Sequence, residues 1–360
     1  MPEGGAPGKT AVGLLRGLRE HGVDVSAVAA RRGFSVAGEV PPDLPVELVD
    51  VEPPGRWAAR LGRLRRPLGE LAGGAFAARV REAAGGADVV HLEETETAWC
   101  DQGVPLPSLV HVHFLARQDR DLGPPWSKQF REVLDASRAE RAAARRHRYL
   151  VASSPLVADE LRAAAPHAEV VVAPLSLDPA LYDPAPLDGA PLAGLIGTAW
   201  WPPTAEAMRA LVHDVWPRVA RAVPESELVV AGRGTAELGL WPTPGVELAG
   251  EVDSARDLFR RLSLLLFPLA RGSGMKVKVL EAMASGVPVV TTPAGAEGIE
   301  PSDGVVVHER PEELAAAAAE LLGDTRARRE RGVAARADFE RCYSPRPATE
   351  PLVELYRRMA

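Results

Sequence analysis

The residues best suited to chemistry lie in one glycine-rich loop in the second half of the chain. This loop, Arg271–Gly274, follows a short apolar run and precedes a helical pattern that we expect to begin near Met275. Glycines let backbone N–H groups approach a ligand closely, and a helix N-terminus carries partial positive charge. Arg271, Lys276 and Lys278 add formal positive charge. The loop therefore predicts a pocket for an anion, and a diphosphate would fit it.

A carboxylate and a second glycine-rich turn extend this prediction. Glu281 lies one to two turns into the expected helix, where it can accept hydrogen bonds from vicinal hydroxyls such as those of a ribose. Gly286 suits the end of that helix. The turn Ala294–Gly298, which includes Gly295, follows the next expected strand and would line the ligand crevice of an open α/β sheet. The alternative is an ordinary strand–loop–helix, because a single glycine-rich loop is weak evidence.

Three histidines lie on strand-like segments of the first half. His111 and His113 alternate within Ser108–Phe114, so both side chains should point to one face of a strand. The carboxyl end of a strand is where ligands bind in α/β sheets, which makes His113 the stronger candidate. His91 ends another expected strand. Each could instead be a structural histidine, and a metal site on the paired histidines would lack a third ligand nearby.

A second glycine-rich loop, Gly4–Gly8, stands before an expected helix at Thr10–His21. Its end, Gly8–Lys9–Thr10, resembles a P-loop. However, the first glycine of that pattern falls on Glu3, and no strand precedes it, so the kinase or ATPase interpretation has little support. A Rossmann-like domain should also begin with a strand, and we expect that first strand to be missing here.

Alternating strand and helix patterns predict a parallel α/β architecture. The chain has 360 residues, more than one core usually serves. Prolines concentrate between Pro174 and Pro191, where they resist helix interiors and central strands. We therefore expect one domain at 1–183, a second at 184–343 and a closing helix at 344–360. The expected strands are Val23–Val28, Asp88–His91, Ser108–Phe114, Tyr149–Ala152, Val170–Ala173, Leu192–Gly197, Glu227–Ala231, Leu264–Pro268, Val287–Thr291 and Gly304–Val307. The expected helices include Thr10–His21, Arg131–Arg146, Ala205–Ala222, Ala255–Leu262, Met275–Ala284 and Pro311–Leu322.

Composition excludes several classes of protein. A net charge of −7 and a pI near 5.7 argue against a nucleic-acid partner, which would favour a basic footprint. Two distant cysteines give no disulfide framework and fit a reducing cytoplasm. No apolar run reaches the roughly 18–20 residues of a membrane span. The basic run Arg56–Arg66 could lie on the inner face of a membrane as a weak peripheral contact, or be a solvated helix face.

The loop and its surroundings resemble a known family. The run PLARGSGMKVKVLEAMASGVPVV, followed by GAEG at 295–298, resembles the retaining nucleotide-sugar glycosyltransferases of family 4, the group 1 glycosyltransferases with the GT-B fold. Further similarity lies at Gly197–Ala205, Glu227–Gly234, Gly250–Asp253 and the tail Cys342–Tyr356. The resemblance implies two Rossmann-like βαβ domains that face each other across a cleft, with a C-terminal helix that crosses back to the N-terminal domain.

The same resemblance implies roles for individual residues. Lys276 or Lys278 would neutralise the diphosphate, Glu281 would hold the ribose, and His113 would hydrogen-bond the transferred sugar and help to orient the acceptor. We take His113, Lys278 and Glu281 as catalytic residues. The expected donor-binding residues are Gly4, Gly5, Arg233, Arg271, Gly272, Ser273, Gly274, Met275, Lys276 and Gly295. The partners are a nucleotide sugar and an acceptor molecule, and neither a cofactor nor a metal is expected.

Two departures from the family pattern bear on the donor. Ser273 stands where many members have the first of two glutamates, which puts the identity of the sugar in doubt. A usual Arg/Lys pair after the first donor-domain strand is absent, and Arg233 is the candidate replacement. Two alternatives to transfer therefore stay open: a GT-B sugar-nucleotide epimerase or phosphorylase, and a non-catalytic protein that binds a nucleotide sugar.

Overall fold

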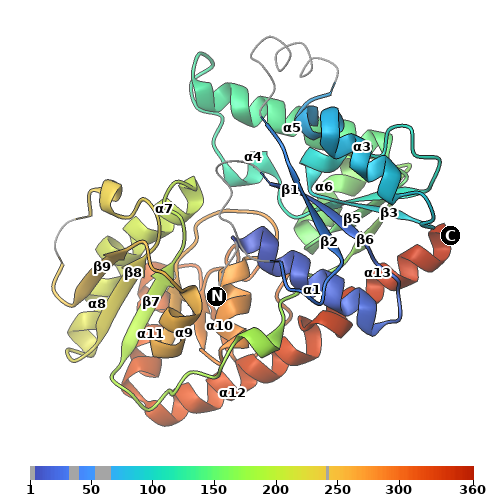
Figure 1. Cartoon of the computed structure of the whole chain (residues 1–360). Helices are drawn as coiled ribbons and strands as arrows, with labels where there is room; N and C mark the ends of the chain where they lie inside the picture. Colours follow the sequence, from blue (N-terminus) through green and yellow to red (C-terminus); the bar gives the residue numbers. More distant parts are fainter. Residues whose placement is uncertain (1–4, 32–39, 53–65, 241–242) are drawn as a thin grey trace. The chain divides into compact units, whose positions relative to one another are not determined.

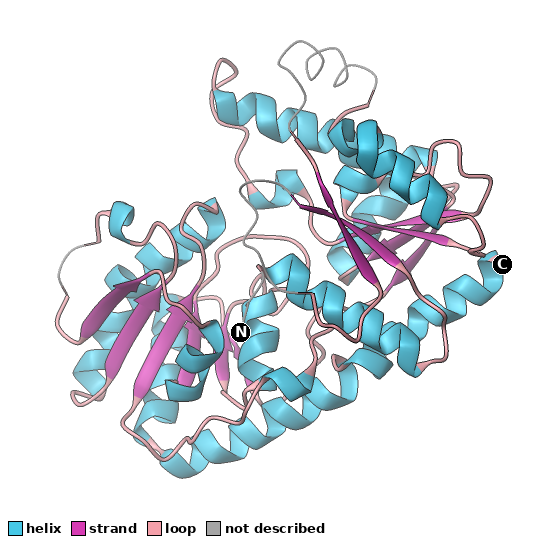
Figure 2. Cartoon of the chain, viewed as in Figure 1, coloured by secondary structure: helices cyan, strands magenta, loops and turns pink. Residues whose placement is uncertain are grey.

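The chain folds as two compact units. The computed structural model describes residues 5–31, 40–52, 66–240 and 243–360. Unit 1 comprises Met1–Ser176 together with Pro345–Ala360, and unit 2 comprises Leu177–Ser344 (Figure 1). Each unit is a set of parallel strands with helices packed around them (Figure 2).

The described residues of unit 1 form two parallel sheets. The larger has the order β3-β4-β5-β6, and the smaller pairs β1 with β2. The strands are β1 (Ala27–Arg31), β2 (Val46–Asp50), β3 (Val90–Glu93), β4 (Ser108–Val112), β5 (Tyr149–Ala152) and β6 (Glu169–Val172). The helices are α1 (Ala6–Glu20), α3 (Gly74–Ala83), α4 (Ala116–Asp119), α5 (Lys128–Arg146), α6 (Pro155–Ala164) and α13 (Pro345–Met359).

The pleat of the larger sheet sends alternate side chains into two different cores. On β4, Val110 and Val112 belong to a cluster that includes Ala143 of α5 and Leu161 of α6. Leu109 of the same strand belongs to a second cluster, with Leu18 of α1 and with Leu352, Val353, Leu355 and Met359 of α13. The second face of the sheet is therefore covered by the first and the last helix of the unit.

The C-terminal helix that the family resemblance implied is present and is part of unit 1. α13 packs along α1, and a Cβ at Gly17 of α1 would lie 2.1 Å from the carbonyl oxygen of Pro345. A helix pair this close requires glycine at that position. The preceding helix, α12 (Thr325–Cys342), belongs to unit 2, so the chain returns to unit 1 between these two helices.

Unit 2 is a six-stranded parallel sheet with the order β12-β11-β10-β7-β8-β9. Counted from its own first strand, this order is 3-2-1-4-5-6 when read from β9, which is that of a dinucleotide-binding Rossmann fold. The direction of winding reverses between β7 and β10. The strands are β7 (Leu192–Ile196), β8 (Glu227–Ala231), β9 (Val246–Gly250), β10 (Leu264–Phe267), β11 (Val289–Thr291) and β12 (Val305–Val307). The α-helices are α7 (Pro202–Ala210), α8 (Trp216–Ala222), α9 (Ala255–Arg261), α10 (Val277–Ala284), α11 (Pro311–Gly323) and α12.

Most expected elements agree with the structure within a few residues, and the differences have local causes. The helix expected at Ala205–Ala222 is interrupted by a π-helical segment, Leu211–Val215, just before Pro217. Proline lacks the N–H that an uninterrupted α-helix needs there. The first strand of unit 1 begins at Ala27 rather than Val23. β2 and β9, both at the end of a sheet, were not predicted.

Candidate functional site

The glycine-rich loop of unit 2 lies at the reversal point of its sheet. The loop joins β10 to α10, and Gly197 follows β7, the neighbouring strand. Open α/β sheets bind ligands outside the carboxyl ends of the two strands that flank such a point. The strand ends also approach one another closely, because a Cβ at Gly232 would lie 1.8 Å from the carbonyl oxygen of Gly197. The predicted anion loop therefore occupies the place where this fold binds ligands.

Lys278 directs its ammonium group into this region. Its Nζ donates to Thr204 Oγ1 over 3.2 Å and lies 4.5 Å from the centre of the Phe267 ring. A Cβ at Gly197 would lie 2.8 Å from this Nζ, so the glycine leaves the space that the ammonium needs. Burial first, and then the neighbouring Lys276, lower the pKa of Lys278 to about 8. An anion beside Nζ would stabilise the charged form.

The loop itself is shaped by glycines and by Lys276. Gly272 and Gly274 have positive φ angles of 146° and 68°, a region that favours glycine. Lys276 is the N-cap residue of α10, and its Nζ donates to the carbonyl oxygens of Ser273 and Gly274. Ser273 and Met275 are buried. The helix begins at Val277, two residues after the expected start, so Lys276 and Lys278 flank its first residue.

Two other predicted cations of unit 2 are paired with carboxylates. Both oxygens of Glu206 accept from Arg271, over 2.7 and 3.2 Å. Arg233 donates to Glu251 over 2.6 Å and is exposed. The structure thus places Arg271 in the β10–α10 loop with a counter-charge, and places Arg233 after β8 in an ion pair with a residue that follows β9.

Glu281 is buried on α10 and has a partner that sequence reasoning missed. The hydroxyl of Tyr182 donates to Glu281 Oε1 over 3.2 Å. Tyr182 is also buried. This contact holds one oxygen of the carboxylate in place. The proline-rich segment that contains Tyr182 gave no sign of this role.

Gly295 lies in the turn that follows β11 and packs closely against the last residue of that strand. A Cβ at Gly295 would lie 1.9 Å from Thr291 Oγ1. Thr291 Oγ1 donates to the carbonyl oxygen of Phe267, and Thr292 Oγ1 donates to that of Leu269. The turn after β11 is therefore tied to the turn after β10, beside the predicted loop.

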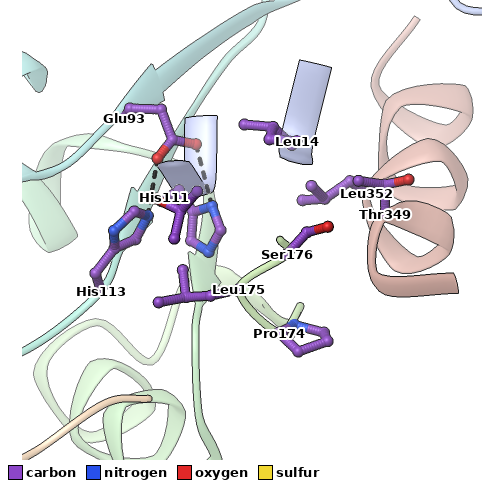
Figure 3. A pocket seen from close by; sticks show the side chains of 10 residues that line it. Leu14, Glu93, His111, His113, Pro174, Leu175, Ser176, Thr349 and Leu352 are labelled. Atoms are coloured by element: carbon purple, nitrogen blue, oxygen red, sulfur yellow. Dashed lines mark hydrogen bonds and ion pairs between the residues drawn. The ribbon is translucent and has the colours of Figure 1, made fainter. Parts of the chain in front are cut away.

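In unit 1, four side chains form a two-by-two arrangement on adjacent strands. Glu93 of β3 pairs with His111 of β4, and His91 pairs with Leu109, two residues before His111. Because strand side chains alternate, His91, Glu93, His111 and His113 all point to the face covered by α1 and α13. Figure 3 shows the Glu93 carboxylate between the imidazoles of His111 and His113. His111 and His113 were predicted to share a face, but Glu93 was missed, although the His-x-Glu spacing of 91–93 repeats that of His111-x-His113.

The charges of this cluster are strongly coupled. His113 lies between two carboxylates, with Nε2 at 2.8 Å from Glu93 Oε2 and Nδ1 at 2.9 Å from Glu94 Oε1. Burial works to lower the pKa of His113, but Glu94 and Glu93 outweigh it and hold this pKa well above its ordinary value. Burial likewise works against the charge of Glu93, but His111 and His113 hold its pKa well below the usual range. Burial lowers the pKa of His111. The favoured state is a charged His113 beside ionised Glu93.

Three further contacts define the surroundings of the cluster. Nδ1 of His91 is hydrogen-bonded to the hydroxyl of Tyr356 on α13. Glu94 adopts a positive φ of 67°, which is uncommon for a residue other than glycine and occurs at functional sites. A cavity of about 10 Å³, room for about one water molecule, adjoins Glu93, His111, His113, Thr10 and Ser176.

The structure also bears on a metal and on the first loop. His91, Glu93 and His111 each offer a ligand atom, and the three atoms lie within 4.8 Å of one another. The paired histidines were expected to lack a third ligand nearby, but His91 and Glu93 lie beside them in the structure. Gly5 is the exposed N-cap residue of α1. Gly4 and nearly all of the basic run Arg56–Arg66 lie outside the described residues.

Comparisons with known families match both units. Residues 5–176 match the family model described as "Glycosyl transferase 4-like domain", and residues 190–324 match the model described as "Glycosyl transferases group 1". Together the two matches cover well over half of the chain. No protein with a curated description matches the sequence.

Solved structures share the fold at low sequence identity. Sucrose-phosphate synthase from Thermosynechococcus elongatus is 16% identical with a TM-score of 0.68, and the match covers 96% of this chain and 91% of that one. HepE of Anabaena, solved with UDP-glucose, is 16% identical with a TM-score of 0.65, over 99% of this chain and 97% of HepE. TarM is 14% identical with a TM-score of 0.59, and the match covers 74% of this chain. That match covers 54% of TarM, so this chain spans about half of its length. A mutant of TarM from S. aureus is among the other matching structures.

Two Rossmann-like units with these structural neighbours define the GT-B fold. The chain belongs to the group 1 glycosyl transferases. Among the described residues, no helix has both the length and the apolar character to cross a membrane.

Proposed function

We propose that the chain transfers a sugar, with retention at the anomeric carbon, from a nucleoside-diphosphate sugar to an acceptor hydroxyl of a glycan, a lipid-linked saccharide or a small natural product. The observation that carries the proposal is the position of Lys278. Its ammonium lies at the reversal point of the unit 2 sheet, close to the N-terminus of α10, with a hydroxyl and an aromatic ring as its neighbours. A diphosphate there would stabilise the charged form of this ammonium group, which burial works against.

The chemistry assigned to unit 2 is electrostatic. The bond from the anomeric carbon to the diphosphate breaks, and its electron pair leaves with the nucleoside diphosphate. The acceptor oxygen forms the new bond and passes its proton to an oxygen of the departing diphosphate. Lys278, Lys276 and the amides at the start of α10 would stabilise the charge that develops on the diphosphate. Because these groups supply positive charge, the proposal needs no metal at the diphosphate.

Glu281 and His113 complete the assignment. Glu281, which is buried on α10, would accept hydrogen bonds from the ribose hydroxyls. His113 would donate to a hydroxyl of the transferred sugar. Its Nδ1 would have to exchange the Glu94 carboxylate, which lies 2.9 Å away and is about 29% exposed, for this hydroxyl. Ser273 is buried and cannot supply the charge of the glutamate found at that position in many relatives.

A panel of nucleoside diphosphates and their sugars tests the proposal. A ligand that binds the folded state raises the melting temperature, so one of UDP, GDP, ADP or TDP should do so. With the matching donor, slow hydrolysis or transfer should then release that diphosphate, and NMR of a transfer product should show the anomeric configuration of the donor. If no diphosphate stabilises the protein, the donor site is wrongly placed. Binding without any turnover would favour the non-catalytic alternative, and an inverted product would contradict retention.

A further inference from the structure

The histidine–glutamate cluster of unit 1 brings three possible metal ligands close together. His91 and Glu93 belong to β3, and His111 is the β4 residue that pairs with Glu93. His91 Nε2 lies 2.7 Å from Glu93 Oε1, and His111 Nδ1 lies 3.2 Å from the same oxygen. Nitrogen and oxygen ligands bind zinc at about 2.0–2.2 Å, which puts neighbouring ligand atoms about 3 Å apart. All three atoms lie within 4.8 Å of one another, and His111 Nδ1 is hydrogen-bonded to the Glu93 oxygen, so the atoms would have to draw together and this bond would have to give way for them to surround one ion.

Two imidazole nitrogens of the cluster lie beside the Glu93 carboxylate without a well-formed hydrogen bond to it. His91 Nε2 is buried 2.7 Å from Glu93 Oε1, and His113 Nε2 is buried 2.8 Å from Glu93 Oε2, yet neither nitrogen makes a hydrogen bond of acceptable geometry with any described residue. A ring N–H that served this carboxylate would point at its oxygen. Two ligands of one metal instead touch each other side by side, each aimed at the ion between them.

The outer contacts of the cluster fit the same interpretation. A histidine that binds a metal usually has its second nitrogen held by a hydrogen bond. In the tautomer that a metal requires, His91 Nδ1–H donates to the hydroxyl oxygen of Tyr356, which leaves the lone pair of Nε2 free. His113 Nε2 holds the other oxygen of the carboxylate, Glu93 Oε2, at 2.8 Å. Tyr356 and His113 thus orient two of the three ligands.

We propose that His91, Glu93 and His111 bind a divalent transition-metal ion of the zinc class in unit 1. Two imidazoles and one carboxylate suit Zn²⁺, Co²⁺ or Fe²⁺ rather than Mg²⁺ or Ca²⁺, which prefer oxygen ligands. Three protein ligands leave at least one position of the ion for water or another ligand. The site is separate from the donor assignment, because the diphosphate pocket is assigned to unit 2 and needs no metal.

Metal uptake by the untagged full-length protein tests this site. The protein is stripped with EDTA, exposed to Zn²⁺ and gel-filtered, and its zinc is counted by mass spectrometry without any nucleotide. We expect one zinc per chain. Co²⁺ should give the visible ligand-field absorption of a four- or five-coordinate ion, and Zn²⁺ should abolish that absorption. His91→Ala and His111→Ala should lose the stoichiometric ion, whereas His167→Ala, which removes an exposed histidine of the same unit, should keep it.

A second variant guards against loss of folding. Glu93→Gln keeps the size of the side chain and removes one ligand charge, so Zn²⁺ affinity should fall at least tenfold while circular dichroism stays that of the wild type. The proposal is overturned if the wild type takes up no Zn²⁺ or Co²⁺. It is also overturned if folded His91→Ala, His111→Ala and Glu93→Gln all bind the ion as the wild type does. Neither result would change nucleotide binding, which is measured separately.

Discussion

Lys278 places an ammonium group where burial works against its charge. Its pKa of about 8 means that the free protein starts to lose this charge just above neutral pH. A diphosphate needs the charged form, so binding above pH 8 must be accompanied by uptake of a proton. Affinity for the nucleoside diphosphate should therefore fall as pH rises from 8 to 9.5, by at most about tenfold per pH unit.

Calorimetry across this pH range, with Lys278→Met as the comparison, checks the prediction. The variant should bind more weakly at pH 7 and should show a flatter pH dependence, because any remaining slope comes from the nucleotide. A wild type and a variant with parallel pH profiles would exclude Lys278 as the titrating group.

The same pKa has the opposite consequence for the stability of the free protein. In the unfolded chain Lys278 keeps its proton up to about pH 10.5, whereas in the folded chain it loses the proton near pH 8. Between these values the unfolded state holds more protons, so the free energy of unfolding should rise with pH. Urea titrations of the free wild type at pH 7.5 and 9.5 should show this rise, and those of Lys278→Met should show a smaller one. A larger rise in the variant would contradict the assignment.

Glu281 carries a prediction that separates ribose recognition from general stability. Hydrogen bonds to a charged group contribute about 1.5–3 kcal/mol, so Glu281→Ala should weaken diphosphate binding by about 10- to 100-fold. The matched control is the 2′-deoxynucleotide, which the wild type should bind more weakly than the ribonucleotide. The variant should no longer distinguish the two. If discrimination survives in Glu281→Ala, the ribose contacts another residue.

The residues of both sites were predictable to different degrees. The residues of the β10–α10 loop follow one another in the sequence, so glycine spacing and local charge were sufficient to find them. Tyr182, Thr204 and Glu206 come from distant segments, and only the folded sheet brings them to Glu281, Lys278 and Arg271. Glu93 was recognisable in principle, since His-x-Glu and His-x-His become neighbours once β3 and β4 pair in register.

At the scale of elements, close approach of strand ends decides the shape of unit 2. Gly232 has a φ of 127°, and a Cβ there would lie 1.8 Å from the backbone of Gly197. Gly232→Ala should therefore cost at least about 1–3 kcal/mol and separate β7 from β8 at the candidate site. The control is Gly239→Ala, because Gly239 also has a positive φ, of 64°, but nothing lies within 4 Å of its Cβ position.

Urea denaturation and nucleotide binding of both variants check this prediction. Gly239→Ala should lose about 1 kcal/mol from backbone strain and should bind nucleotide normally. Gly232→Ala should lose more stability and bind nucleotide weakly. Equal losses in the two variants would show that backbone strain, rather than the contact with Gly197, limits position 232.

The bounds of strands were predicted best where both faces of the strand are buried. β5 and β8 agree with the expected bounds because central parallel strands are continuous apolar runs. β9 was missed because a half-exposed strand at the end of the sheet, preceded by proline and glycine, carries a weaker pattern. The π-helical interruption before Pro217 arises because proline has no backbone N–H. The spacing of apolar residues gives no sign of such an interruption.

At the scale of the whole molecule, each unit has a core of its own, although unit 1 is assembled from both ends of the chain. Leu355 of α13 and Leu266 of β10 are each fully buried, one in each unit. Replacing a buried leucine by alanine costs about 2–5 kcal/mol in the unit that contains it. We therefore expect calorimetry to show two thermal transitions, one lowered by Leu355→Ala and the other by Leu266→Ala.

The nucleoside diphosphate should then shift only the thermal transition of the unit that binds it. A nucleoside diphosphate that binds the β10–α10 loop stabilises only the unit that holds the loop, so it should raise the transition that Leu266→Ala lowers. The transition that Leu355→Ala lowers should not move with the diphosphate, and under the metal proposal it should rise when Zn²⁺ is added. If the diphosphate raises only the Leu355-sensitive transition, the donor site belongs to unit 1. A single transition that responds to Leu355→Ala, to Leu266→Ala, to the diphosphate and to Zn²⁺ would show that the two units unfold together. The free energy that links their unfolding would then exceed the stability lost by either leucine substitution.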